Sequence, residues 1–153
     1  MESKVTITQY AQKVQVLAGT FLSESFQKKT ISIDDWKFIQ TDLLQGIDQL
    51  LRQEGTSPDE EGEAILAILM GYTVAIRNNR HIDQTLERAE RIFHKITKPI
   101  LKAKLAVFCY GECFDEELAE MAHQLLKELK PTEEVMQLEA LLMSMEESYE
   151  IIE

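Results

Sequence analysis

Glycine and proline are scarce in this chain of 153 residues, which holds 6 glycines and 3 prolines. So few turn-forming residues leave little material for the tight hairpins of a β-rich fold. The 2 cysteines, Cys109 and Cys113, are too few for a disulfide framework and suggest a reducing compartment. The opening residues lack a basic region followed by an apolar core, so we expect no secretory signal peptide and a cytoplasmic protein.

Long hydrophobic runs are also absent. The least polar stretch is AILAILMGYTVAI at residues 64–76, between the charged segments DEEGE and RNNR. A membrane-spanning helix needs about 20 predominantly apolar residues, so this stretch is too short to cross a bilayer. We predict a buried helix of a soluble protein. Because the stretch is apolar nearly all round, it should have neighbours on most sides.

The charge of the chain is acidic overall and unevenly distributed. The net charge is -11. Residues 77–104 carry 8 basic and 3 acidic side chains, whereas residues 112–153 carry 2 basic and 13 acidic ones. A net acidic protein is repelled by nucleic acid at long range and attracted to basic partners. The alternative is that acidic helix faces only keep the protein soluble.

Apolar residues recur at helical spacing along the whole chain, and no segment alternates as a strand does. The length and the composition, with 44% hydrophobic residues, fit one globular domain over residues 1–153. We therefore predict an all-α, single-domain bundle of about seven helices whose last residues fray. The first helix runs to about residue 26 and turns inward Ile7, Tyr10, Ala11, Val14, Leu17, Ala18, Phe21 and Leu22. The second, capped by Ser32, buries Trp36, Ile39, Leu43, Ile47, Leu50 and Leu51.

The third helix has the clearest start signal. Ser57 stands at the cap, Pro58 at the first helical position and Glu60 at the third. The serine hydroxyl can accept from a free backbone amide while the glutamate reaches back to the amide of the cap. Small residues then share one helical face, which lets another helix approach closely: Ala64, Ala67, Gly71 and Ala75.

The C-terminal half predicts two stacked helical hairpins. A fourth helix carries Ile82, Leu86, Ala89, Phe93 and Ile96. Pro99 opens a fifth helix with Leu101, Leu105 and Phe108 inward, and Asp115 caps a sixth with Leu118, Met121, Ala122, Leu125 and Leu129. A seventh follows with Val135, Leu138, Leu142, Met145 and Tyr149. A faint repeat at an offset of 32 pairs Leu86 with Leu118, which favours a tetratricopeptide-like arrangement packed on the N-terminal helices.

Metal chemistry finds weak support. Glu120 and His123 form one Glu-x-x-His unit, but di-iron bundles need two such units and two further glutamates. Glu90 and His94 are spaced by four, so the second unit is missing. We interpret Glu120 and His123 as surface residues.

The cysteines and the search for catalytic motifs likewise give no support for a metal site or an enzyme. Cys109 and Cys113 lack the second ligand pair of a structural zinc site, and we interpret both as buried structural thiols. No glycine-rich phosphate loop, His-Glu-x-x-His motif or nucleophile elbow occurs. We predict neither an enzyme nor a cofactor, although a small ligand-binding helical enzyme stays open.

The basic stretch could form an exposed stripe. Its members are Arg77, Arg80, Arg88, Arg91, Lys95, Lys98, Lys102 and Lys104, of which Arg88, Arg91, Lys95 and Lys98 recur at helical spacing. No aromatic residues are interleaved to stack on bases, and the surrounding acidity opposes phosphate. We favour a solvated face paired with Glu87, Glu90 or the acidic C-terminal third, without direct nucleic-acid binding.

Two motifs stand out in the central and C-terminal parts of the chain. The first is Leu69, Met70, Gly71 and Tyr72, and the second is Cys109, Tyr110, Gly111, Glu112, Phe114, Asp115, Glu116, Glu117, Leu118 and Ala119. Together they resemble the UpxZ family of antagonists of transcription antiterminators. In that family a Thr/Ser-Pro-acidic cap leads into an apolar helix that ends in Leu-Met-Gly-Tyr, and a segment Cys-Tyr-Gly-Glu with Phe-Asp-Glu-Glu-Leu-Ala follows later. The resemblance covers roughly residues 57–129, and the first 56 residues do not contribute to it.

The resemblance implies a cytoplasmic bacterial protein encoded with capsular polysaccharide operons. Such a protein inhibits NusG-like antiterminators of the UpxY type from other capsule loci. We predict partner contacts at Tyr110, Glu112, Asp115, Glu116 and Glu117, with the tyrosine as an aromatic anchor if exposed. The alternative for the acids is local, because a first-turn carboxylate caps a helix or opposes its dipole. A helical adaptor that grips a peptide between its C-terminal hairpins is the second candidate.

Overall fold

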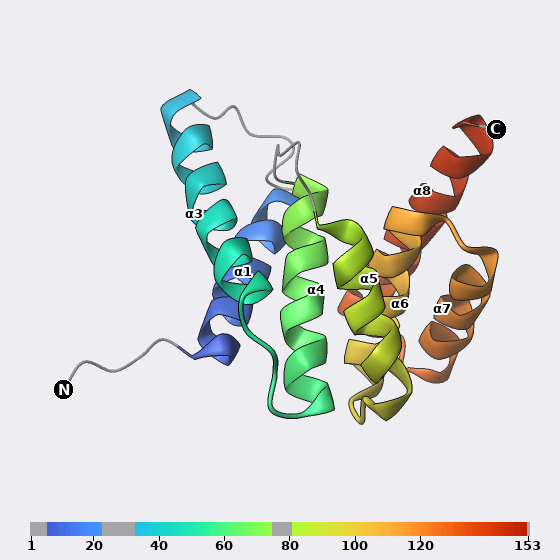
Figure 1. The fold of residues 1–153 in the computed structure, drawn as a ribbon. Helices are drawn as coiled ribbons and strands as arrows, with labels where there is room; N and C mark the ends of the chain where they lie inside the picture. The colour runs from blue at the N-terminus through green and yellow to red at the C-terminus, as the bar shows by residue number, and fades with distance from the viewer. Residues whose placement is uncertain (1–5, 23–32, 75–80, 153) are drawn as a thin grey trace.

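The protein is helical throughout the residues that the structure describes. The computed structural model describes residues 6–22, 33–74 and 81–152, and within them no strand occurs (Figure 1). The elements in chain order are α1 (Ile7–Leu22), α3 (Ile33–Leu51), α4 (Pro58–Val74), α5 (Ile82–Ile92), the short 3-10 helix η1 (Phe93–Lys95), α6 (Pro99–Cys113), α7 (Glu116–Glu128) and α8 (Glu133–Ile152). The all-α prediction is confirmed, with seven α-helices in these ranges.

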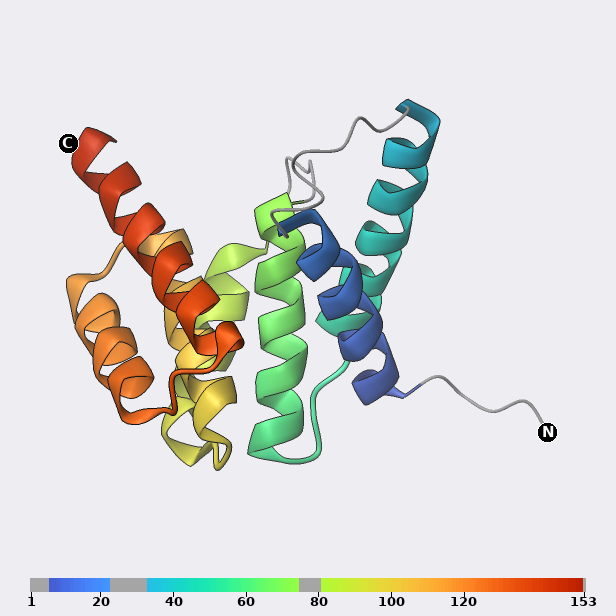
Figure 2. The same ribbon diagram turned by 180° about the vertical axis from the view of Figure 1, so that it is seen from behind.

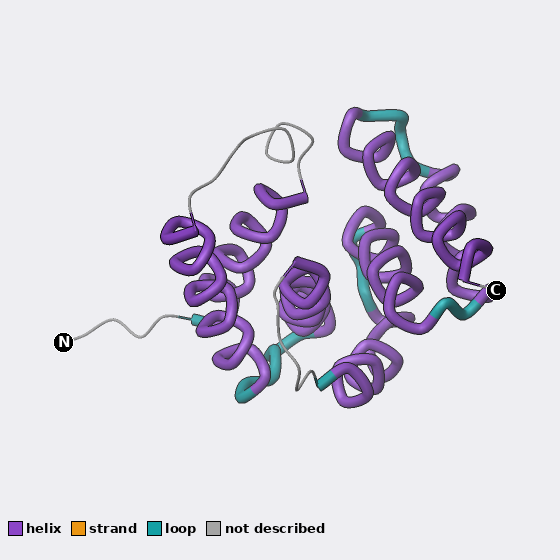
Figure 3. Tube along the Cα trace, turned by 90° about the horizontal axis from the view of Figure 1, so that it is seen from above, coloured by secondary structure: helices purple, strands orange, loops and turns teal. Residues whose placement is uncertain are grey.

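Helix α4 lies at the centre of the structure. Helices α1 and α3 are on one side of it and α5 to α8 on the other, and it is seen almost end-on between them from above (Figures 1 and 3). It contacts α1, α3, α5 and α6. Over residues 64–72 the apolar stretch is therefore covered by neighbours on most sides, as its composition predicts. Among the described helices, none is both long enough and apolar enough to cross a bilayer.

The first hydrophobic cluster joins α4 to α1 and α3. Its buried residues are Ile7, Ala11, Val14, Ala18, Leu43, Ile47, Leu50, Ala64, Ala67, Ile68 and Tyr72. The small face of α4 seats these two helices. A Cβ placed on Gly71 would lie 2.6 Å from Cδ1 of Ile47 and 3.4 Å from Cγ1 of Val14. The predicted close approach is thus confirmed for the described part of this face.

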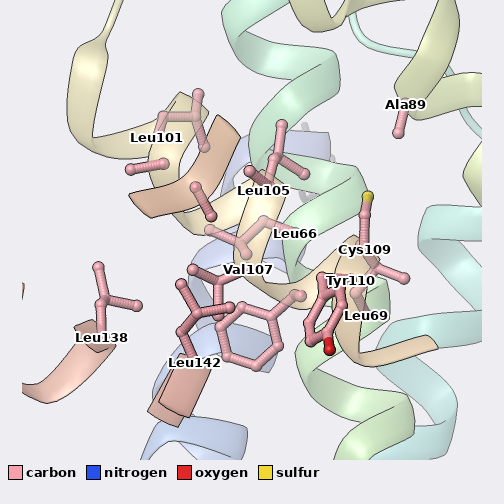
Figure 4. Packing of buried hydrophobic residues seen from close by; sticks show 14 of the residues in the cluster. Leu66, Leu69, Ala89, Leu101, Leu105, Val107, Cys109, Tyr110, Leu138 and Leu142 are labelled. Carbon is pink, nitrogen blue, oxygen red and sulfur yellow. The ribbon is translucent and has the colours of Figure 1, made fainter. Parts of the chain in front are cut away.

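The second cluster joins the opposite face of α4 to the C-terminal helices (Figure 4). From α4 it takes Ile65, Leu66 and Leu69, and α6 is buried along most of its length. Met70 is half-buried and packs against both clusters. Of the predicted core motif, Leu69, Gly71 and Tyr72 are buried, whereas Met70 lies at the boundary between the clusters.

The predicted helix starts are confirmed with one change. The amide of Glu60 donates to the Ser57 hydroxyl at 3.1 Å. The Glu60 carboxylate accepts from the amide of Thr56 at 2.8 Å, one residue before the predicted partner. This bond is the main reason that the pKa of Glu60 is lowered. At α7 the Asp115 carboxylate accepts from the amide of Glu117 at 3.0 Å, and Pro99 opens α6.

A buried ion pair ties the two sides of the molecule together. Arg88 on α5 is 8% exposed and donates from Nη2 to Oε1 of Glu61 on α4 at 2.6 Å. Its Nε donates to the same carboxylate at 3.0 Å. Nη1 and Nη2 also donate to the carbonyls of Leu50 and Gln53, at 3.2 and 2.9 Å. One guanidinium therefore joins the end of α3, the start of α4 and the middle of α5.

In the C-terminal half, α6 packs against α4, α7 and α8, while α5 packs mainly on α4. The tetratricopeptide-like comparison stays a prediction. The repeat at an offset of 32 also pairs Asp83 with Asp115, yet Asp83 lies inside α5 whereas Asp115 precedes α7 as its cap. Several predicted features lie outside the described residues: the Ser32 cap, the first helix beyond Leu22, and the side chains of Phe21, Trp36, Ile39, Ala75 and Tyr149.

Candidate functional site

A groove of about 370 Å³ lies between α5 and α7, with α6 as its floor. The wall from α5 and η1 begins at residue 86, and the wall from α7 includes residues 117–121. Helices α5 and α7 stand apart over the buried α6, as the front view shows (Figure 1). The volume is at the low end of the range of ligand-binding cavities, about 300–1,000 Å³. The groove thus has room for a few side chains.

The groove combines an apolar interior with an acidic rim. Its apolar lining consists of Leu86, Ala89, Phe93, Leu118 and Met121. Its polar lining consists of Glu90, His94, Cys113, Asp115 and Glu117, with the thiol of Cys109 on the floor. Leu86 and Leu118, which the repeat at an offset of 32 pairs in the sequence, line this same groove from its two walls.

The turn from α6 to α7 forms one end of the groove. Phe114 ends α6 in the left-handed conformation, with φ 54° and ψ 34°. For a bulky residue this conformation is unusual and stores about 1–3 kcal/mol of strain. The Phe114 ring meets the ring of Tyr110 edge-on at 5.6 Å between centroids. The tight turn brings Asp115 and Glu117 directly to the groove.

The predicted contact residues fall into three environments. Tyr110 is 3% exposed and belongs to the second cluster, so the exposure that its role as an aromatic anchor requires is not met (Figure 4). Helices α4, α7 and α8 pack against α6 on several sides, which explains the burial of Tyr110. Glu112 is half-buried. Asp115, Glu116 and Glu117 are exposed, and of these Asp115 and Glu117 line the groove.

The two cysteines differ in environment. Cys109 is buried, as predicted, and burial raises the pKa of its thiol to about 12. Cys113 is exposed, so its predicted burial is wrong, and its thiol donates to the Cys109 carbonyl at 3.2 Å. Cys113 is the last residue of α6 and lines the groove, which accounts for the exposure.

His123 and Glu120 lie on the surface, as predicted. The partner of His123 is Glu146 on α8, with 2.5 Å between Nε2 and Oε1. Within the ranges that the structure describes, no group of three His, Cys, Asp or Glu side chains is placed to hold a metal ion.

The basic stretch does not form the exposed stripe that its spacing allows. Arg88 is buried and pairs with Glu61, whereas Arg91, Lys95 and Lys98 are exposed. Lys104 pairs with Glu134 on α8, which confirms the expected pairing with the acidic C-terminal third. Arg77 and Arg80 lie outside the described residues.

Sequence reasoning missed the groove itself, and of its lining it predicted only Asp115 and Glu117 as contact residues. Glu90 and His94 were considered only as an incomplete metal unit, yet both lie on the wall opposite Glu117. The repeat that pairs Leu86 with Leu118 was the available signal, because equivalent positions of stacked helical units line a common surface.

Comparison with known proteins agrees with this architecture. The model of the UpxZ family of transcription anti-terminator antagonists matches residues 11–111. The match begins well before residue 57, so it includes N-terminal helices that the two motifs did not cover. No curated protein matches the chain.

A solved structure is similar over nearly the whole chain. The crystal structure of a transcription anti-terminator antagonist UpxZ from Bacteroides uniformis ATCC 8492 has a TM-score of 0.82 and 28% sequence identity. The similarity covers 93% of this chain and 93% of that one. The family match over 101 of the 153 residues and the shared helical fold lead to one conclusion. The chain belongs to the UpxZ family of transcription anti-terminator antagonists.

Proposed function

We propose that the protein binds a NusG-like antiterminator of the UpxY type in the cytoplasm and inhibits it. The inhibited antiterminator would serve a capsular polysaccharide operon other than the one that encodes this chain, so that one locus predominates. Membership of the UpxZ family is the observation that carries this proposal. The protein partner follows from that membership, since an antagonist of antiterminators acts on a protein. Its identity as a UpxY-type protein is our proposal.

The charge of the protein supports binding to a basic partner. Antiterminators act beside RNA polymerase and nascent RNA, and a face that contacts nucleic acid is basic. An acidic surface on the antagonist attracts such a face and speeds the encounter. Glu116 and Glu117 at the start of α7 are exposed and available for this contact. Occupying the basic face would block access of the antiterminator to RNA polymerase or RNA.

The same glutamates also have a local role at the start of α7. Two carboxylates in the first turn oppose the helix dipole, which contributes about 0.3–1 kcal/mol each. Asp115 is different, because its carboxylate already caps the helix. We therefore assign Asp115 mainly to the turn and the two glutamates to both roles.

Charge reversal separates the two roles. The variant Glu116→Lys with Glu117→Lys should lose binding to the antiterminator in a pull-down with purified proteins. The matched control is Glu139→Lys with Glu147→Lys, which changes the net charge equally at exposed positions of α8. Circular dichroism must show both variants folded. Undiminished binding by the folded Glu116 and Glu117 variant would remove these residues from the interface.

A further inference from the structure

We propose that the groove between α5 and α7 is the primary docking site for an amphipathic helical segment of the antiterminator. This segment has apolar side chains on its inward face and Lys or Arg on both flanks. The inference rests on the proposed function, because it takes the antiterminator as the partner. The contact described above lies at Glu116 and Glu117, at the start of α7. The present inference instead places most of the binding energy in the groove.

The apolar interior supplies the reason for a groove-bound partner. Leu86, Leu118 and Met121 line the groove and are only half-buried in the free protein. Burying such side chains against a partner is favourable, roughly 25 cal/mol for each Å² of apolar surface removed from water. The walls are helices over a helical floor, so they offer no strand edge to an extended peptide. A helix laid between two helices is the mode of recognition that suits this geometry.

The rim decides the charge of the occupant. Glu90 stands on the α5 wall, and Asp115 and Glu117 stand on the α7 side. In the part of the chain that the structure describes, His94 is the one lining residue able to carry positive charge. An acidic or neutral segment would leave the carboxylates on both walls without compensation. A segment with basic residues on either side of an apolar ridge pairs with both walls at once.

The strained turn favours the same place. Phe114 keeps a left-handed backbone that a glycine would adopt more easily. Strained conformations persist where the surrounding structure holds them, and they cluster at functional sites. Here the strained residue sets the position of Asp115 and Glu117 at the mouth of the groove.

Adjacent glutamates provide a matched test. Glu117 lines the groove, whereas Glu116 shares its helical turn and exposure but does not line it. We expect Glu117→Lys and Glu90→Lys each to weaken binding about tenfold. Glu116→Lys changes the acidic surface outside the groove and should weaken binding only about twofold, whereas Glu139→Lys on α8 should leave it unchanged. The affinity would be measured by calorimetry with the full chain and purified NusG-like antiterminators from the capsule loci of the host. Equal effects at positions 116 and 117, with no effect at position 90, would overturn the groove.

Apolar truncation provides an uncharged test. Met121→Ser removes a groove side chain, and Met136→Ser removes one from α8, where Met136 is 60% exposed. We expect about a tenfold loss for Met121→Ser and no loss for Met136→Ser. Thermal melts establish whether each variant is folded. If Met121→Ser does not fold, the loss of binding by Glu90→Lys, a change at an exposed position, tests the groove instead.

Zero-length cross-linking identifies the bound segment. A carbodiimide joins a carboxylate to a lysine amine that lies in ion-pair contact with it. We expect cross-links from Glu90 and Glu117 to lysines that flank an apolar helical segment of the antiterminator. Cross-links confined to carboxylates outside the groove would overturn the inference while leaving the proposed function intact. No binding of the unmodified protein to any of these antiterminators would overturn the proposed function, and the inference with it.

Discussion

Adding one methyl group at Gly71 should destabilise the protein even though alanine is the better helix former. The new Cβ would lie 2.6 and 2.9 Å from Cδ1 and Cγ1 of Ile47, which is fully buried. Overpacking of this kind costs about 1–3 kcal/mol. Replacing a helical glycine by alanine gains about 1 kcal/mol. We expect Gly71→Ala to be about 1 kcal/mol less stable, since the two effects oppose each other.

Urea unfolding followed by circular dichroism measures this change, and Gly19→Ala is the matched control. A Cβ at Gly19 meets nothing closer than 4.0 Å, so the alanine should stabilise the protein by about 0.5–1 kcal/mol. Ile47→Val removes Cδ1, the atom nearest to the new Cβ. The double variant with Gly71→Ala should therefore be more stable than the sum of the two single effects predicts, by about 0.5 kcal/mol or more. Equal stabilisation by both alanines, without coupling to Ile47, would refute the close packing of α4.

Three further predictions concern ionisable side chains. Arg88→Met should lower the free energy of unfolding by about 3–5 kcal/mol, because it leaves the buried carboxylate of Glu61 without its cation. Chemical denaturation measures this free energy, and a loss under about 1 kcal/mol would contradict the burial of the ion pair. In the native protein at pH 8, iodoacetamide should modify the exposed Cys113 and spare the buried Cys109. The pKa of about 12 leaves only about one Cys109 thiol in ten thousand ionised. Mass spectrometry of the labelled peptides measures the modification, and equal labelling of the two cysteines would contradict the prediction. The hydroxyl and amide of residue 97 donate to the Asp59 carboxylate, which lowers the pKa of Asp59 below its ordinary value of 3.8. The ionised carboxylate therefore stabilises the folded protein above pH 3.8, and this stabilisation is lost as the pH falls through the pKa of the folded state. The stability difference between the parent and Asp59→Asn should therefore shrink in urea melts below pH 3.8, and a difference that grows would reverse the sign of the argument.

Local signals in the sequence predicted the helices well. The Ser57 cap, the proline that opens α6 and the Asp115 cap depend on residues within one helical turn. The small face of α4 was also readable, because a glycine is retained inside an apolar helix only where a neighbour approaches closely. The burial of α4 followed from its composition alone.

Pairings between distant segments were not predictable. Arg88 pairs with Glu61, 27 residues away, and nothing in a single sequence distinguishes it from its solvated neighbours Arg91 and Lys95. The burial of Tyr110 was not predictable for a related reason. Helix α6 is buried on several sides, so its apolar stripe does not mark one inward face. The groove arises from how far α5 and α7 stand apart, which depends on the whole packing.

The most direct test of the account is calorimetric titration of the purified protein with a purified NusG-like antiterminator, in parallel with Glu90→Lys and Glu116→Lys. We predict saturable binding that weakens with added salt, is reduced about tenfold by Glu90→Lys and is reduced only about twofold by Glu116→Lys. Unmeasurable binding of the parent protein to the antiterminators of its host would contradict the proposed function. Tight binding that neither variant changes would keep the function but move the interface away from the groove.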